Sequence, residues 1–540
     1  AAAESLLGKN WEDVPGEALS SSVKLVTTPN SLGHLADGYR LVRATLEHVA
    51  AFRQKTAAQP PKEGDEQKPR LPDYEIPRLL GEQLRAAVEL GRWAEALALL
   101  QENPAWNARD VSGLLRERVA SNKRPVGFYA AQVALHQQDP GRARRILEAQ
   151  LVATPRVDAV YEAYLGLVKK EATPLLEKLL AADRYEERPL IWRARLEHDA
   201  KKWDAAIATL QQAITIDPSD GEEGRGDRMR VYAFMALAVR GKGDAVKAKF
   251  FEDVVRSIRL SETADRWFET GAYEHAITLY RQALGFFQDA YCIQSRLAVR
   301  LADEGKMDEA AEHYRRAFEL MPDSFGRVES HCFGCEHVFA GEKSQGVAEQ
   351  VFTTMLAARP DKPQLHYLMG YLRQQQERPA EAAGYFRRAV ELDPLYLNAW
   401  DKLGNLEGKL HFTPAQHDDL QLKLLELDPG RHHASPSLST VTDLARLWKV
   451  MAEASRVIAA LPATGPLWEL KASAEQLGQK GSDARPWESS DREKDFAAVL
   501  LEHRFVEALQ AYLASLNAPR ENTEEEDAKP EAENPVISAF

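Results

Sequence analysis

The sequence predicts an all-α fold, a solenoid of antiparallel helix pairs stacked one on the next. One observation behind this is a pattern of small and large residues that recurs at a period of about 34 residues, the length of a helix-turn-helix repeat. Another is that prolines stand at a fixed place in this pattern, where a helix has to end. The composition agrees, with 44% hydrophobic and 28% charged residues among 540.

The repeat is clearest over residues 363–396, where positions 8, 20, 24, 27 and 32 carry residue types with a packing role. Small residues let the two helices of a pair approach closely, an aromatic residue fills the space between them, and proline stops the second helix. These marked residues are Gly370, Ala382, Phe386, Ala389 and Pro394. Each pair is therefore expected to bury these positions between its two helices.

The same frame fits other parts of the chain in phase. It fits residues 291–324 through Ala310, Tyr314, Ala317 and Pro322. The further matching ranges are 187–220, 257–290, 329–362 and 397–430, with a degenerate unit around Met229 to Ile258. Several units in phase are hard to obtain by chance. The sequence thus predicts an array of about seven helix pairs over residues 187–430.

In these residues the chain resembles the tetratricopeptide repeat proteins. The resemblance covers a little under half of the sequence strongly, and it departs from the family where an aromatic residue is expected at position 11, since Leu301 and Arg373 stand there. It implies a right-handed superhelical solenoid with a concave face lined by the first helix of each pair. It also implies a non-enzymatic adaptor or scaffold that binds a peptide or a partner helix on that face.

The remaining sequence divides into segments of different composition. Residues 1–54 form an N-terminal extension with a helix expected near its end, and residues 55–73 are a proline-rich, charged linker. Residues 74–186 carry looser helix-pair repeats. After the array, residues 431–516 are expected to supply capping helices, and the acidic tail 517–540 is expected to be disordered.

Charge and hydrophobicity exclude two classes of partner from the prediction. The net charge of -13 would repel phosphate backbones, and no dense Lys/Arg cluster offsets it, so nucleic acid is not an expected partner. No apolar stretch approaches the roughly 18 residues of a membrane span. The sequence leaves the oligomeric state open. For the compartment, the cytoplasm is preferred, but Ala1, Ala2 and Ala3 are also what signal-peptide cleavage after small residues leaves behind, so export stays an alternative.

A pair of thiols, Cys332 and Cys335, is the sharpest local motif, flanked by His331 and His337. This spacing suits a zinc site or a redox pair. In the repeat frame, however, the two cysteines occupy positions 4 and 7, where side chains point into the core, and no second C-x-x-C completes a four-thiolate site. We therefore interpret them as core residues and predict no metal and no cofactor.

The family resemblance also implies a binding stripe, because such repeats contact ligands through positions 2, 5, 9 and 12 of the first helix. Carried onto three successive units, with the neighbouring Lys402 added, these positions give Phe333, His337, Gln364, Tyr367, Tyr371, Gln374, Asn398, Asp401, Lys402 and Asn405. Flat aromatic rings among amides suit a peptide held by apolar contact and backbone hydrogen bonds. The alternative is that the tyrosines fill the core between repeats.

The predicted function is therefore a protein or peptide adaptor without catalytic residues, since no phosphate-binding loop, nucleophile elbow or zinc-protease motif is found. Two alternatives remain open. One is a regulatory or substrate-presenting subunit of an enzyme complex. The other is a zinc or redox protein that uses Cys332 and Cys335.

Overall fold

The structure is a computed structural model that describes residues 26–57, 75–103, 117–122, 124–217, 227–328 and 341–430, with shorter stretches and single positions between 24 and 453. The described residues are helical, and their β-structure is limited to one isolated bridge between Arg118 and Pro125. The chain forms two compact units that divide after Ala172. The predicted linker beyond Ala57, most of the predicted capping segment and the acidic tail lie outside the described residues.

The first unit consists of helices that pack mainly against their neighbours in sequence. The pairs are α3 with α4, α4 with α5, and α8 with α9, and α10 then packs on α9. Their bounds are α3 Leu35–Ala57, α4 Glu75–Glu89, α5 Trp93–Glu102, α8 Val126–His136, α9 Pro140–Ala153 and α10 Asp158–Val168, followed by the 3-10 helix η3 Lys169–Ala172. Helix α3 covers the stretch where the sequence predicts a helix and continues two residues beyond Lys55.

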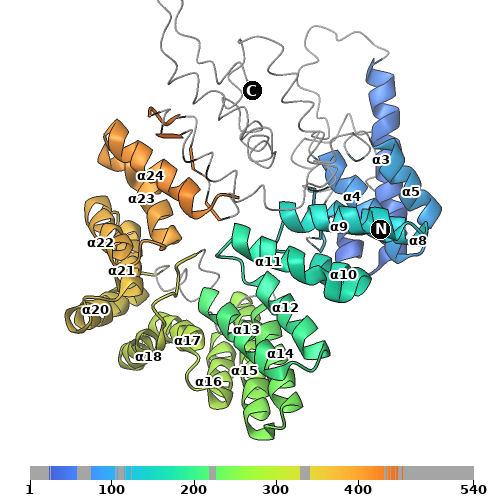
Figure 1. Ribbon diagram of the computed structural model, residues 1–540. Helices are drawn as coiled ribbons and strands as arrows, with labels where there is room; N and C mark the ends of the chain where they lie inside the picture. Colours follow the sequence, from blue (N-terminus) through green and yellow to red (C-terminus); the bar gives the residue numbers. More distant parts are fainter. Residues whose placement is uncertain are drawn as a thin grey trace, which may run out of the picture. The chain divides into compact units, whose positions relative to one another are not determined.

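The second unit begins at Thr173 and contains the repeat array, whose helices follow one another along a curved row (Figure 1). Neighbouring helices pack as pairs: α12 with α13, α14 with α15, α17 with α18, α21 with α22, and α23 with α24. The bounds are α11 Thr173–Ala182, α12 Arg188–Asp199, α13 Trp203–Ile216, α14 Asp227–Gly241, α15 Ala245–Glu269, α16 Tyr273–Phe286, α17 Tyr291–Asp303, α18 Met307–Leu320, α20 Glu342–Ala358, α21 Pro363–Gln375, α22 Pro379–Leu392, α23 Leu397–Leu410 and α24 Pro414–Leu427. The fold is an all-α solenoid of helix pairs, as the repeat period predicts.

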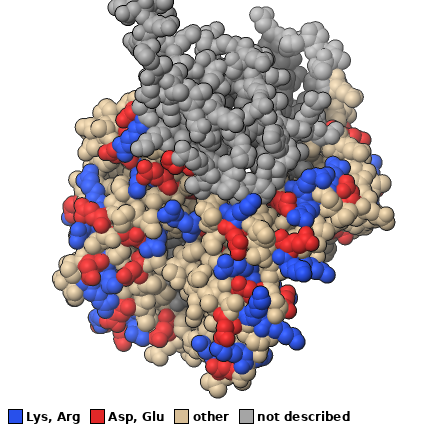
Figure 2. All heavy atoms as spheres, viewed as in Figure 1, with Lys and Arg blue, Asp and Glu red and all other residues tan. Residues whose placement is uncertain are grey.

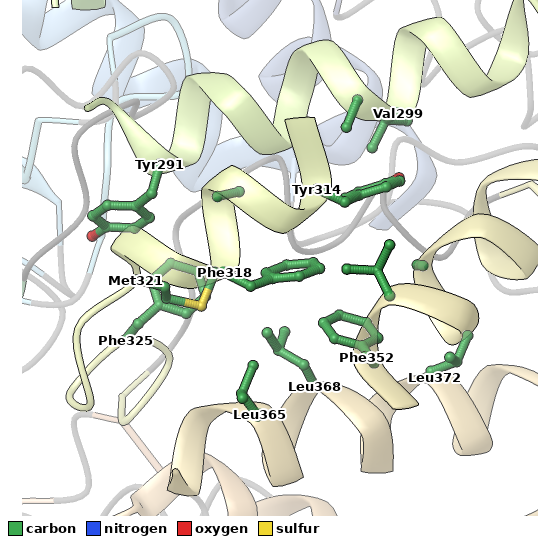
Figure 3. Packing of buried hydrophobic residues seen from close by; sticks show 14 of the residues in the cluster. Tyr291, Val299, Tyr314, Phe318, Met321, Phe325, Phe352, Leu365, Leu368 and Leu372 are labelled. Atoms are coloured by element: carbon green, nitrogen blue, oxygen red, sulfur yellow. The ribbon is translucent and has the colours of Figure 1, made fainter. Parts of the chain in front are cut away.

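The positions that define the repeat frame form the core of this unit. Positions 20, 24 and 27 are fully buried in four of the matching units, at Ala206, Leu210, Ala213, Ala276, Tyr280, Ala283, Ala310, Tyr314, Ala317, Ala382, Phe386 and Ala389. The core continues from pair to pair through aromatic contacts. In Figure 3 the Phe318 ring lies between Tyr314 and Phe352, with ring centroids 5.7 and 4.3 Å apart. Burial of these rings stabilises neighbouring pairs against each other.

The turn inside each pair explains why glycine at position 15 is not constant. After α17, Gly305 has a φ of 79°, and the Lys306 amide donates to the Leu301 carbonyl at 2.8 Å. After α21 the same left-handed position is held by Glu377, with a φ of 58°. The Arg378 amide there donates to the Arg373 carbonyl at 2.9 Å. Both are helix-terminating turns that favour glycine without requiring it.

Two glycines in one helix pair give a test of the packing. A Cβ on Gly370 of α21 would lie 2.7 Å from the Phe386 ring, whereas a Cβ on Gly384 of α22 meets no atom within 4 Å. Gly384→Ala is therefore expected to raise the free energy of unfolding by about 0.5–1 kcal/mol, the usual gain inside a helix. Gly370→Ala is expected to lower it by about 1–3 kcal/mol through overpacking. Urea unfolding of the two variants measures both, and a gain for Gly370→Ala would contradict the close approach of α21 and α22.

One element differs from the sequence expectation. The units predicted around Met229 to Ile258 and over residues 257–290 are joined by a single helix, α15, which pairs with α14 through one part and with α16 through another. The physical reason is that α15 contains neither glycine nor proline, so nothing ends it where proline ends the second helix in other units.

A buried polar network holds α15, α16 and α17 together. The Arg296 guanidinium on α17 donates from Nη1 to Asp265 Oδ2 at 2.6 Å and to Ser261 Oγ at 2.9 Å. The Tyr280 hydroxyl also donates to Asp265, and burial together with the Asp265 charge raises the pKa of Tyr280. The side chains of Arg296 and Asp265 are 0% and 3% exposed. Each charge in this network therefore depends on its partner.

The connection between α11 and α12, near the start of the second unit, contacts the segments around α23 and α24 near its end. His433, which follows α24, lies with its Nε2 2.8 Å from Asp183 Oδ2, in the connection from α11 to α12. The Tyr185 hydroxyl donates to the Leu395 carbonyl at 3.0 Å. The Tyr185 ring packs in a cluster with Leu397, Leu424, Leu427 and Ala434. We call this set the closure contact. It joins segments about 210 and 250 residues apart, which the repeat frame does not predict.

Candidate partner-binding site

The predicted stripe residues lie on two helices of the array. Gln364, Tyr367, Tyr371 and Gln374 are on α21, and Asn398, Asp401, Lys402 and Asn405 are on α23. Phe333 and His337 lie outside the described residues, as do Cys332 and Cys335. The structure divides the eight described positions into a buried group and an accessible group.

Gln364 and Tyr367 are buried, with exposed fractions of 2% and 4%. The Tyr367 ring packs against Tyr396 and Phe386, with centroids 5.1 and 5.9 Å away. For Tyr367 this is the alternative in which the tyrosines fill the core between repeats.

Asn398 is also engaged, and its partner is a segment of the same chain. Its side-chain Nδ2 donates to the Gly326 carbonyl at 2.9 Å and to the Val328 carbonyl at 2.6 Å. These carbonyls belong to residues 321–328, the non-helical segment after α18, which we call the strap. Gln364 contacts the strap as well, because its Nε2 donates to the Met321 carbonyl at 3.3 Å. The side-chain amides of Asn398 and Gln364 are therefore engaged by backbone carbonyls of the chain itself.

The other five residues remain accessible, and we call them the open stripe: Tyr371, Gln374, Asp401, Lys402 and Asn405. The Lys402 ammonium of α23 lies 5.3 Å from the centre of the Tyr371 ring of α21, so the two helices present these side chains together. Asn405 donates to Asp401 Oδ2 at 3.2 Å. Burial raises the pKa of Asp401, and the opposing effects of Lys402 and Asn405 are smaller.

The open stripe combines an aromatic face with side-chain amides. Gln374 and Asn405 each carry one, although Gln374 Oε1 itself is buried and has no hydrogen-bond partner among the described residues. The Tyr371 ring offers apolar contact area beside it, and Lys402 places a positive charge over that ring. Together these groups suit an extended peptide backbone with one apolar side chain.

The rest of the described surface adds little local chemistry. Basic and acidic side chains are interspersed on the face seen in Figure 2. Within the described ranges no cluster of three or more His, Cys, Asp or Glu residues is arranged to hold a metal ion. None of the described helices has the length and apolar character to cross a bilayer. Cys292 is a buried cysteine on α17.

The repeat pattern did not identify the residues that hold the strap, because they lie in connections between helices. Tyr396 and Asp393 hold the strap, Asp393 through Arg327 of the strap, and both lie outside the helix positions that the family uses. A signal was present in Gly326, which follows a buried aromatic residue, Phe325, soon after the helix-ending proline. Gly326 has a φ of 69°, the left-handed region that favours glycine.

Comparisons with known proteins bear on the repeat itself. Residues 346–396 match the family described as "Tetratricopeptide repeat". Among solved structures, the yeast Tom70 crystal structure is 11% identical, covering 92% of this chain and 96% of that chain with a TM-score of 0.27. An IFIT1 monomeric mutant with Gppp-AAAA is 13% identical, covering 92% and 90% with a TM-score of 0.24. The P58(IPK) TPR domain is 15% identical, covering 73% and 98% with a TM-score of 0.19.

TM-scores this low carry no argument about this chain, and comparison with curated protein sequences gives no significant match. The conclusion depends on the family match and on the helix pairs around it. The matched residues include the pair α21 and α22, whose frame positions are buried as in the neighbouring pairs. Residues 346–396 therefore carry a tetratricopeptide repeat, within an all-α array of helix pairs.

Proposed function

We propose that this chain is a non-catalytic adaptor that binds an extended peptide segment of a partner protein along the open stripe. Tetratricopeptide repeats support a protein-interaction role in general, because stacked helix pairs create long surfaces for binding. The finer assignment to the open stripe depends on one observation: the accessible side chains of Tyr371 and Lys402, from neighbouring repeats, lie together.

The arrangement favours a peptide over a flat protein surface. Gln374 on α21 and Asn405 on α23 present amide groups on two helices, so a strand-like segment crossing both can bond to each. Tyr371 lies between the buried Tyr367 ring, 6.5 Å away, and the Lys402 ammonium. Its position is therefore fixed before a partner arrives, which lowers the entropy lost on binding.

A photo-crosslinker placed at Asn405 of the full chain tests this proposal. We expect it to capture a partner, while the same group at Arg388, exposed on the second helix of the preceding pair, does not. Tyr371→Ala should reduce capture by roughly fivefold or more, as for a binding hot spot. Tyr385→Ala is the matched control, because Tyr385 is a half-buried tyrosine on α22.

Two outcomes would contradict the proposal. Equal capture from positions 405 and 388 would show that binding does not follow the open stripe. A large loss of melting temperature in Tyr371→Ala, with no loss of capture by the folded fraction, would assign Tyr371 to the core. If the captured protein is a subunit of an enzyme complex, the adaptor acts as a regulatory or substrate-presenting subunit.

A further inference from the structure

The strap makes contacts that differ from those of an ordinary helix connection. It follows α18, yet it contacts Asp393 after α22 and Tyr396 and Asn398 at the start of α23, between 66 and 72 residues further along the chain. It also packs on α21, through Gln364 and Tyr367. The segment thus lies against two later helix pairs.

The start of α23 recognises the strap backbone at every residue from 325 to 328. The Tyr396 hydroxyl donates to the Phe325 carbonyl. Asn398 Nδ2 donates to the carbonyls of Gly326 and Val328, and the Asn398 amide donates to the Arg327 carbonyl at 3.0 Å. Four consecutive carbonyls are bound by two residues of one helix terminus. This is how a binding site holds an extended peptide independently of its side chains.

The same four residues also differ in what surrounds them. Phe325 is buried with its ring edge-on to Tyr291, at a centroid distance of 5.4 Å, and Figure 3 shows the two side by side. A Cβ on Gly326 would lie 3.0 Å from the Tyr396 hydroxyl. Arg327 Nε lies 2.7 Å from Asp393 Oδ2, and Val328 packs on the apolar cluster of the closure contact. These surroundings suit an aromatic residue, a glycine, an arginine and an aliphatic residue in that order.

We propose that the start of α23 is a second peptide-binding site, now filled by the strap as a resident ligand, and that a partner segment with the pattern aromatic-glycine-arginine-aliphatic displaces it. This inference extends the proposed adaptor function, because it names the sequence class of one ligand and the contact that regulates its access.

Tethering explains why the resident ligand occupies the site when no partner is present. A segment on a short connection acts at an effective concentration of the order of millimolar. A free peptide with the same contacts competes only near that concentration, so the site responds to partners that gain affinity elsewhere on the array. The donors at Tyr396 and Asn398 also require acceptors, since leaving them unbonded costs free energy.

Binding of a fluorescent octapeptide with the sequence of residues 321–328 to the full chain tests the inference. The unaltered chain is expected to bind it only near millimolar concentration. In Arg327→Ala, which breaks the ion pair with Asp393 in the resident strap, the apparent affinity should rise about tenfold, because the free fraction of the site rises. Gly326→Ala should act in the same direction through the contact with Tyr396.

Two controls make the result specific. A peptide in which alanine replaces the residue equivalent to Gly326 should bind at least about tenfold more weakly, because its methyl group meets Tyr396. Asn398→Ala added to Arg327→Ala should abolish binding, since it removes two hydrogen bonds to the peptide. If Gly326→Ala fails to fold, the peptide affinity of Arg327→Ala alone tests the inference. Arg327 is 27% exposed and lies at the edge of the site, so its replacement should leave the fold intact.

The inference is overturned if Arg327→Ala, with an unchanged melting temperature, binds the peptide no better than the unaltered chain. It is also overturned if the alanine-substituted peptide binds equally well. Neither outcome affects crosslinking at Asn405, so failure of this site and failure of the open stripe are distinguishable. Conversely, peptide binding at α23 without any capture at Asn405 would retain this site and reject the open stripe.

Discussion

Replacing Asp265 by alanine is expected to lower the free energy of unfolding by about 3–5 kcal/mol, because it leaves the Arg296 guanidinium buried without its carboxylate. The Tyr280 hydroxyl loses its acceptor at the same time. Urea unfolding of the full chain, followed by circular dichroism, measures the effect. Arg296→Met should cost a similar amount, since it leaves Asp265 as the uncompensated charge.

The double variant Asp265→Leu with Arg296→Met separates the charge effect from packing. If the buried charge is the cause, the double variant is more stable than either single variant, because both charges leave the core together. The ion pair between Lys249 and Asp253 on the same helix is the matched control, with Lys249 62% exposed. Asp253→Ala should change stability by less than about 0.5 kcal/mol. Equal losses for Asp265→Ala and Asp253→Ala would contradict the role given to burial.

Ending the chain after residue 430 is expected to lower the free energy of unfolding by at least about 3 kcal/mol and to cause aggregation. The cut removes His433 and Ala434, and with them half of the closure contact around Tyr185. It also removes Thr442 and Asp443, which donate to the buried Asp418 carboxylate of α24 at distances between 2.7 and 2.9 Å. Thermal melting and size-exclusion chromatography measure the two effects.

A chain that ends after residue 520 is the control, because an acidic tail has little apolar surface to bury. It should unfold like the full chain.

The pH dependence of the free energy of unfolding gives a second readout of the same cut. Burial alone would raise the pKa of Asp418, but hydrogen bonds from Thr442 and Asp443 outweigh it and hold that pKa below its usual range. A lowered pKa in the folded state adds stability above the unfolded pKa, and this stability is lost as the pH falls through the folded pKa. The chain that ends after residue 430 should lack the stability that Asp418 contributes. A fragment 1–430 that is soluble and as stable as the full chain would contradict the prediction that the residues after 430 cap the array.

Much of the fold could be predicted because its information is local. Ala382, Phe386 and Ala389 are spaced so that one helix face is small and aromatic, and the structure buries all three. Such spacing needs only helix geometry and close packing of neighbours. The continuous helix α15 was not predicted, although the absence of glycine and proline from its sequence is the signal that would have revealed it.

The candidate site was predicted less well, because position in a repeat does not determine curvature. Tyr367 and Tyr371 are one helical turn apart, yet the first is buried between pairs and the second is half-exposed. Tyr185 and His433 lie in connections without a hydrophobic period, so no pattern relates them before the array is folded. Contacts across 250 residues follow from the summed rotation of all the pairs between them.

The closure contact also constrains how this protein can change over evolution. Repeat arrays with open ends gain or lose units by duplication, since each unit needs only its neighbours. In the second unit a duplicated pair would separate Asp183 from His433 and expose Leu424 and Leu427 to water. Gaining or losing a pair would therefore break the closure contact, whereas substitutions that keep the length of the array can preserve it.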